Sequence, residues 1–212
     1  MNCRKEDLLL YAVTDRSWLR GRTLYEQVEE ALQGGATFIQ LREKNMESEY
    51  FREEAIILKE LCRKYCVPFV INDDVAIARQ VDADGVHVGQ KDMEAGNVRN
   101  LIGPNKILGV SVQDAEQAIM AEKRGADYLG VGAIFNTGSK TDADKVSKET
   151  LTAICQAVNI PVIAIGGINQ TNVLKLKETG ICGIAVISAV FANDNITLAT
   201  QELKKLAQVL VK

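Results

Sequence analysis

The sequence predicts a (β/α)8 barrel that forms a single domain over residues 1–212. Strand-like apolar runs alternate with helix-like segments along the whole chain, and eight such units fit a chain of this length. The runs are short and almost entirely apolar, as expected of parallel strands that are buried on both faces. An open doubly wound sheet is the alternative, but the glycine fingerprint that normally follows its first strand is missing after residues 8–14.

Eight strands are expected in order along the chain. They lie at residues 8–14, 38–41, 69–72, 85–88, 106–110, 128–131, 162–165 and 183–187. Several of these runs stop at an abrupt polar or glycine cluster, as where Phe69-Val70-Ile71 meets Asn72-Asp73-Asp74. The C-terminal ends of the strands form the catalytic face of such barrels. The clusters therefore predict the position of the functional site.

Helices are expected between the strands. They lie at residues 24–34, 47–65, 76–81, 97–101, 148–158, 172–178 and 197–211, and another begins after Asp114 and ends near residue 124. Gly34-Gly35 ends the first of them. Asp74 and Asp114 have the side chain that an N-cap needs. A polar loop at residues 135–146 follows the sixth strand.

The composition excludes some classes of partner. Hydrophobic residues make up 47% of the chain and charged residues 25%, which is ordinary for a soluble globular protein. The net charge of −3 gives no basic surplus for nucleic acid or an anionic membrane. No apolar stretch approaches the roughly 20 residues of a membrane span or resembles a signal peptide, so we expect a cytoplasmic protein. The five cysteines form no Cys-x-x-Cys pair and are expected to be reduced thiols. A homo-oligomer remains open, since barrels often associate through their outer helices.

Glycine and serine follow the last two strands. Ile165-Gly166-Gly167-Ile168 comes after the seventh strand, and Ile187-Ser188 ends the eighth. In many (β/α)8 barrels, backbone N–H groups of these two loops hold a phosphate. Glycine allows the backbone to approach the phosphate oxygens closely, although a tight turn would also explain the pair. We expect a phosphate here.

Two acidic residues follow neighbouring strands. Asp73 ends the third strand, and Asp92 follows the fourth. Carboxylates without a Cys or His cluster favour Mg²⁺ over zinc, and Mg²⁺ commonly joins one or two carboxylates to substrate phosphates. We therefore expect Asp73 and Asp92 to bind Mg²⁺, while Asp74 caps the next helix.

Cationic residues surround the expected metal site. Alternation along the second strand sends Gln40, Arg42 and Lys44 to one side and Leu41 and Glu43 to the other. Lys140 lies in the loop after the sixth strand. Two or three cations with Mg²⁺ suit a diphosphate better than a monophosphate.

The single histidine, His87, lies within the fourth strand rather than beyond it. A role as a general base is one interpretation. We prefer a role in lining the barrel or in supporting a residue that binds the ligand.

Taken together, these segments resemble thiamine-phosphate synthases. The matching stretches are Tyr11-Ala12-Val13-Thr14-Asp15, Gln40-Leu41-Arg42-Glu43-Lys44, Asn72-Asp73-Asp74, Gly85-Val86-His87-Val88-Gly89-Gln90 with Asp92, Gly109-Val110-Ser111, Gly130-Val131-Gly132-Ala133-Ile134-Phe135, Thr137-Gly138-Ser139-Lys140, Ile165-Gly166-Gly167-Ile168 and Ala185-Val186-Ile187-Ser188. No single stretch is diagnostic, but the ordered set is specific and spans nearly the whole chain.

The resemblance implies a reaction and assigns residues to it. Such enzymes join 4-amino-2-methyl-5-hydroxymethylpyrimidine diphosphate to a thiazole phosphate, which gives thiamine phosphate and diphosphate. The pyrimidine diphosphate would contact Gln40, Leu41, Arg42, Glu43, Lys44, Asn72, Ser111 and Lys140, of which Arg42, Ser111 and Lys140 would act in catalysis. The thiazole phosphate would contact Thr137, Gly138, Ser139, Gly167, Ile187 and Ser188, and Mg²⁺ would bind Asp73 and Asp92.

Two other functions are compatible with such a barrel. A related thiazole tautomerase handles only the thiazole phosphate, and we would expect it to carry a histidine two residues after Ser111, where this chain has Gln113. A catalytically inactive barrel that binds a phosphorylated ligand is the other alternative. The acids Asp73 and Asp92, together with Lys140, favour the synthase over both.

Overall fold

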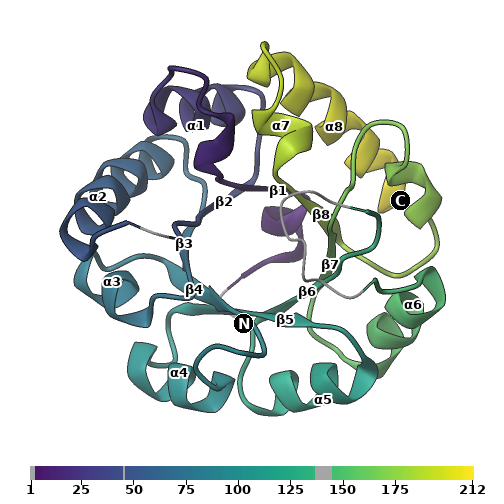
Figure 1. Ribbon diagram of the computed structural model, residues 1–212. Coiled ribbons are helices and arrows are strands. Elements are labelled where there is room, and N and C mark those ends of the chain that lie inside the picture. The colour runs from purple at the N-terminus through teal and green to yellow at the C-terminus, as the bar shows by residue number, and fades with distance from the viewer. Residues whose placement is uncertain (1–2, 45, 137–144) are drawn as a thin grey trace.

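Eight parallel strands close into a barrel in the computed structural model, which describes residues 3–44, 46–136 and 145–212. The strands are β1 (Leu10–Val13), β2 (Phe38–Leu41), β3 (Phe69–Asn72), β4 (Gly85–Val88), β5 (Ile107–Val112), β6 (Tyr128–Val131), β7 (Val162–Ile165) and β8 (Gly183–Val186). Each strand pairs with the next in the sequence, and β8 pairs with β1 with Leu10 opposite Ile184. Figure 1 looks along the axis of the barrel. The predicted (β/α)8 barrel is confirmed.

Helices form a ring around the strands (Figure 1). The α-helices are α1 (Leu24–Gln33), α2 (Ser48–Lys64), α3 (Val75–Gln80), α4 (Ala95–Ile102), α5 (Ala115–Lys123), α6 (Lys148–Ala157), α7 (Ser188–Phe191) and α8 (Ile196–Leu210). Short 3-10 helices are η1 (Lys5–Leu8), η2 (Arg16–Trp18) and η3 (Val173–Leu176). Among the described residues, no helix combines the length and the apolar character needed to cross a membrane.

The helices begin where polar side chains can satisfy the first backbone N–H groups. Asp74 accepts a hydrogen bond from the backbone N–H of Ile77, and Asp114 accepts one from that of Gln117. Both expected N-caps are therefore confirmed.

Several element boundaries differ from the sequence-based expectation. The segment expected as a helix at residues 172–178 is only the 3-10 turn η3, because the chain turns at Lys177 before a second turn can form. The first strand is shorter than expected, since Lys5–Leu8 forms η1. The single-turn helix α7 was not expected, and β5 extends past Ser111 to Val112.

Alternate strand residues divide the core into two parts. One set, including Leu41, Leu129 and Ile184, packs between the strands and the helices. The other set fills the barrel interior with Tyr11, Val13, Phe38, Val70, Ile107, Tyr128, Ile163 and Ala185, joined by Cys3 and Leu8 from the N-terminal segment. Successive side chains on a strand point to opposite faces of the sheet. Because both faces are buried here, the core divides in two. The apolar interior fills the N-terminal end of the barrel and leaves the C-terminal end for polar groups.

The close contact of β4 with β5 at Gly85 gives a test of the fold. A Cβ atom at Gly85 would lie 2.1 Å from the backbone oxygen of Ile107. Gly85→Ala should therefore lower the free energy of unfolding by about 1 to 3 kcal/mol, measured by urea denaturation, because the backbone has to shift. Gly96→Ala is the matched control, since the new Cβ would meet only the flexible carboxylate of Glu94 at 3.2 Å. An equally stable Gly85→Ala variant would contradict this packing.

Candidate functional site

A cavity of about 330 Å³ opens at the C-terminal end of the barrel. It is lined by residues from all eight strands and from loops that follow them. Of the residues expected in the site, those that line it are Gln40, Arg42, Asn72, Asp73, Asp92, Ser111 and Ile187. These residues lie far apart in the sequence, and the barrel places them around one space, as the strand-end pattern predicts.

Arg42 is a tightly held cation at the edge of the cavity. Its backbone N–H donates to Thr14 Oγ1 at 3.0 Å, and its Nη1 lies 3.5 Å from Asp15 Oδ2. The residue is only 8% exposed, and its Nη2 is buried without a hydrogen-bond partner among the described residues. Buried polar atoms are normally satisfied, so this nitrogen, on a residue that lines the cavity, is suited to bind an anion.

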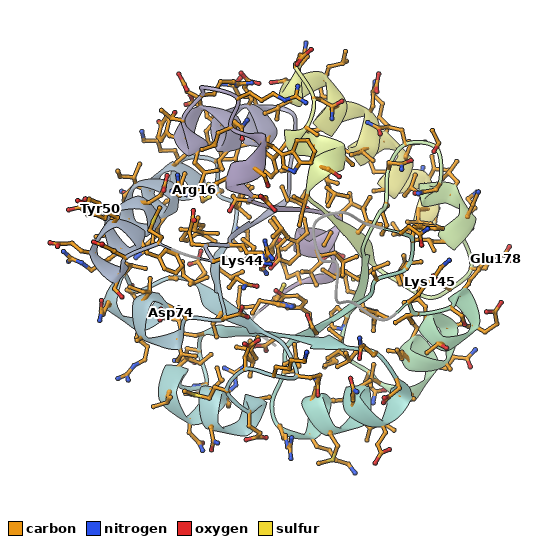
Figure 2. All side chains as sticks on the ribbon, viewed as in Figure 1. Arg16, Lys44, Tyr50, Asp74, Lys145 and Glu178 are labelled. Atoms are coloured by element: carbon orange, nitrogen blue, oxygen red, sulfur yellow. The ribbon has the colours of Figure 1, made fainter. Side chains whose placement is uncertain are left out.

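The neighbours of Arg42 have different surroundings. Leu41 is fully buried against the helices and does not line the cavity. Glu43 accepts a hydrogen bond from Arg16 Nε at 2.7 Å; burial raises the pKa of Glu43, and Arg16 opposes part of that rise. Lys44 is exposed and lies over the open end of the barrel in Figure 2, nearer the axis than Arg16. The expected alternation thus holds for Arg42 and Leu41.

The two acids approach the cavity from adjacent loops. Asp73 has a backbone φ of 62°, a left-handed conformation that is uncommon for a residue other than glycine, and its N–H donates to the His87 carbonyl at 2.8 Å. Its carboxylate accepts from Asn72 Nδ2 at 2.5 Å. Asp92 Oδ2 accepts from the Gly89 N–H at 2.7 Å, which fixes its loop. In the parts of the chain that the structure describes, no group of three or more His, Cys, Asp and Glu residues is arranged to hold a metal.

A chain of hydrogen bonds crosses the barrel beneath the cavity. Gln40 Nε2 donates to the Tyr11 hydroxyl at 2.6 Å, and that hydroxyl lies 2.8 Å from the hydroxyl of Tyr128. The Tyr128 hydroxyl lies 2.9 Å from His87 Nδ1, and His87 Nε2 lies 2.9 Å from Ser111 Oγ. Both tyrosines are fully buried. The histidine therefore lines the barrel and contacts a residue expected in the site, in agreement with the preferred interpretation.

The glycine loop after β7 is held in a tight conformation. Gly166 and Gly167 have φ values of 101° and 64°, and the Gly167 carbonyl accepts from Asn172 Nδ2 at 2.9 Å. A Cβ at Gly166 would lie 2.6 Å from the Cα of Ala133, so both conformation and space require glycine there. Gly166 lines the cavity directly, whereas Gly167 and Ser188 lie outside its lining.

Some residues expected in the site lie outside the described residues. In addition, the cavity is lined by residues that were not expected there. Thr137, Gly138, Ser139 and Lys140 fall in residues 137–144, outside the described residues. Gln90 was not expected to contact a ligand, although it lines the cavity and donates from Nε2 to the Ser111 carbonyl at 2.7 Å. Its position two residues before Asp92 was the available signal.

Comparisons with known proteins point to one family. A family model described as thiamine monophosphate synthase matches residues 10–190. A thiamine-phosphate synthase of Clostridium tetani is 54% identical over 203 residues, covering 96% of this chain and 97% of the relative. One from Persephonella marina is 44% identical over 202 residues, with 95% and 97% covered. The solved structure of a thiamine phosphate pyrophosphorylase from Pyrococcus furiosus superposes with a TM-score of 0.90 at 43% identity, covering 98% of this chain and 99% of that one.

The unpaired Nη2 of Arg42 gives a test of anion binding. Inorganic diphosphate should stabilise the protein against thermal unfolding, by about 2.7 kcal/mol at 100 times its dissociation constant. Arg42→Gln should remove most of this stabilisation, because the buried cation that pairs with the anion is lost. Arg63→Gln, which changes an exposed arginine on α2 that pairs with Glu60, should keep it. An undiminished shift in the Arg42 variant would place the anion elsewhere.

Proposed function

Because the chain belongs to the thiamine monophosphate synthase family, we propose that it joins 4-amino-2-methyl-5-hydroxymethylpyrimidine diphosphate to a thiazole phosphate. The products are thiamine phosphate and diphosphate, so the reaction is a transfer of the pyrimidinylmethyl group. The observation that carries the proposal is the buried, unpaired Nη2 of Arg42 at a cavity that Asp73 and Asp92 also line. This is the constellation that a diphosphate leaving group requires.

The proposed chemistry is a dissociative substitution at the pyrimidine methylene. The bond from the methylene carbon to the diphosphate oxygen breaks, and its electron pair leaves with the diphosphate. The aminopyrimidine ring stabilises the resulting methylene cation by donating electron density from its amino group. The lone pair of the thiazole nitrogen then forms the new carbon–nitrogen bond. Such a reaction depends on neutralising the leaving group and on positioning the nucleophile.

Different residues at the cavity would bind the diphosphate and orient the pyrimidine. Arg42 would grip the diphosphate oxygens while Asp15 and Thr14 hold it in place. Asn72 and Ser111 would orient the pyrimidine diphosphate from β3 and β5, and Gln40 would do so from β2. Lys44 lies at the open end of the barrel, where a point charge can meet a diphosphate (Figure 2). Lys140 would add a further cation from residues outside the described part.

The acids fit Mg²⁺. Asp73 and Asp92 would hold the ion, and the two carboxylates leave most of its six or so ligand positions to substrate oxygens and water. This oxygen-only donor set supports Mg²⁺ over a softer metal. When bound, Mg²⁺ would neutralise charge on the departing diphosphate.

The thiazole phosphate would bind at the opposite side of the cavity. Gly167, Ile187 and Ser188 would hold it from the loops after β7 and β8, with Thr137, Gly138 and Ser139 completing the site from residues outside the described part. The glycine conformations at Gly166 and Gly167 support a backbone that approaches an anion closely. Two anion sites would thus face each other across the barrel axis.

The activity can be tested directly. Incubation of the protein with both substrates and Mg²⁺ should release diphosphate and form thiamine phosphate in equal amounts. A tautomerase would instead isomerise the thiazole phosphate alone, and an inactive binding protein would form neither product. No thiamine phosphate from a folded protein would refute the proposal.

The adjacent residues Asp73 and Asp74 provide a matched test of the metal ligands. Asp73→Asn and Asp92→Asn should each lower kcat at least a hundredfold at limiting Mg²⁺, because each removes a carboxylate from the ion. Asparagine tolerates the left-handed backbone of Asp73, so the substitution there adds no strain. Asp74→Asn should keep both activity and stability, since asparagine caps helices as well as aspartate does. Equal losses at positions 73 and 74 would contradict the assignment.

A further inference from the structure

We propose that the buried hydroxyls of Tyr11 and Tyr128 set the direction of the hydrogen-bond chain from Gln40 to Ser111. In that direction His87 carries its proton on Nε2, Ser111 offers a hydrogen-bond donor to the cavity, and Gln40 offers an acceptor. Tyr11 and Tyr128 are then positioning residues for Gln40 and Ser111, the two ends of the hydrogen-bond chain. Only the identity of the ligand, the pyrimidine diphosphate, rests on the proposed function.

The count of donors and acceptors fixes the direction. Gln40 Nε2 can only donate, so the Tyr11 oxygen accepts at this end. The single hydrogen of Tyr11 then goes to the Tyr128 oxygen, 2.8 Å away, and the single hydrogen of Tyr128 goes to His87 Nδ1. With Nδ1 as acceptor, Nε2 carries the proton and donates to Ser111 Oγ. The hydrogen of Ser111 remains for a ligand.

The opposite tautomer leaves a hydrogen without an acceptor. If His87 Nδ1 donates to Tyr128, that oxygen can pass its own hydrogen only to Tyr11. Tyr11 would then accept from both Gln40 and Tyr128, and its own hydrogen would have no acceptor among the contacts of the described residues. Tyr11 and Tyr128 are 1% and 0% exposed, so a hydroxyl hydrogen left without a protein acceptor costs free energy. A protonated imidazole has the same defect, since both of its nitrogens donate.

The raised pKa values of the two tyrosine hydroxyls support the same hydrogen-bond chain. Burial raises the pKa of Tyr11 and of Tyr128 above the ordinary value, so both hydroxyls keep their hydrogens under ordinary conditions. Each therefore supplies the one donor that the count requires.

Two strand glycines make room for this chain. A Cβ at Gly109 would lie 2.2 Å from Tyr128 Cζ and 2.4 Å from His87 Nδ1. A Cβ at Gly130 would lie 3.2 Å from His87 Cε1. Any side chain at Gly109 would displace the tyrosine–histidine bond. The small residue on β5 thus leaves space for the hydrogen-bond chain where it crosses the barrel.

The two ends of the chain face the cavity with opposite hydrogen-bonding character. The Nε2 of Gln40 points to Tyr11, which leaves Oε1 as the acceptor on the β2 side. Ser111 also lines the cavity and presents its hydroxyl hydrogen from β5. An aminopyrimidine carries both an amino donor and ring-nitrogen acceptors, so a fixed donor and a fixed acceptor would favour one orientation of its ring.

The single histidine allows a direct measurement of the tautomer. In protein labelled with ¹⁵N histidine, the NMR spectrum of His87 at about pH 8, above the ordinary imidazole pKa of about 6.5, reports which nitrogen carries the proton. We expect the Nε2–H form without any substrate. The Nδ1–H form or an imidazolium in the wild-type protein would overturn the proposal.

Conservative tyrosine variants separate this role from packing. Tyr128→Phe removes the donor to Nδ1, so His87 should show a mixture of tautomers. Tyr11→Phe leaves Nδ1 as the only acceptor for Tyr128 and should keep the Nε2–H form. Tyr50→Phe, on the outer face of α2, is the control and should change nothing (Figure 2). A Tyr128→Phe protein with an unchanged tautomer would overturn the proposal.

Kinetics provide a second readout that depends on the proposed function. Tyr11→Phe and Tyr128→Phe should each lower kcat/KM for the pyrimidine diphosphate about tenfold, with an unchanged KM for the thiazole phosphate. Equal effects on both substrates would indicate a structural role and refute positioning. An inactive wild-type protein would refute the proposed function, while the tautomer measurement would still decide the hydrogen-bond chain.

Discussion

The pairing of β8 with β1 closes the barrel, and the site depends on this closure. Leu10, Tyr11 and Ala12 pair with Ile184, Ala185 and Val186, so the last strand completes a wall that the first strand began. All eight strands run parallel, which places their C-terminal ends on one rim. Arg42 and Ile187, near opposite ends of the chain, therefore line the same cavity. In an open sheet these two residues would lie at opposite edges.

Closure also creates an interior that has to be filled. Leu8, Phe38 and Ile107 fill it with apolar side chains toward the N-terminal end. Tyr11 and Tyr128 belong to the same apolar cluster, but their hydroxyls reach the polar layer above it. A tyrosine can serve both environments because its ring is apolar and its tip is not. The core and the floor of the cavity are thus built from the same side chains, and a core substitution here would also change the cavity.

The sequence predicted the barrel well because strands that are buried on both faces appear as short, nearly continuous apolar runs. Phe69-Val70-Ile71 could hardly be anything but a strand, and Asp74 follows it where a cap is needed. The short turn η3 and the helix α7 were misjudged because neither is long enough to show helical periodicity. The hydrogen-bond chain was out of reach, since Tyr11 and Tyr128 are 117 positions apart and look like ordinary strand residues. Only the register of the closed barrel brings their hydroxyls together.

The N-terminal segment has a consequence for the order of folding. Leu8 packs inside the barrel, the Leu9 carbonyl accepts from the Ile184 N–H, and the Leu8 carbonyl lies against Gly183. During synthesis, this segment leaves the ribosome before β8, and its binding place does not exist until β8 has emerged. Leu8 and Leu9 must therefore stay undocked until a strand more than 170 positions later in the sequence has been made.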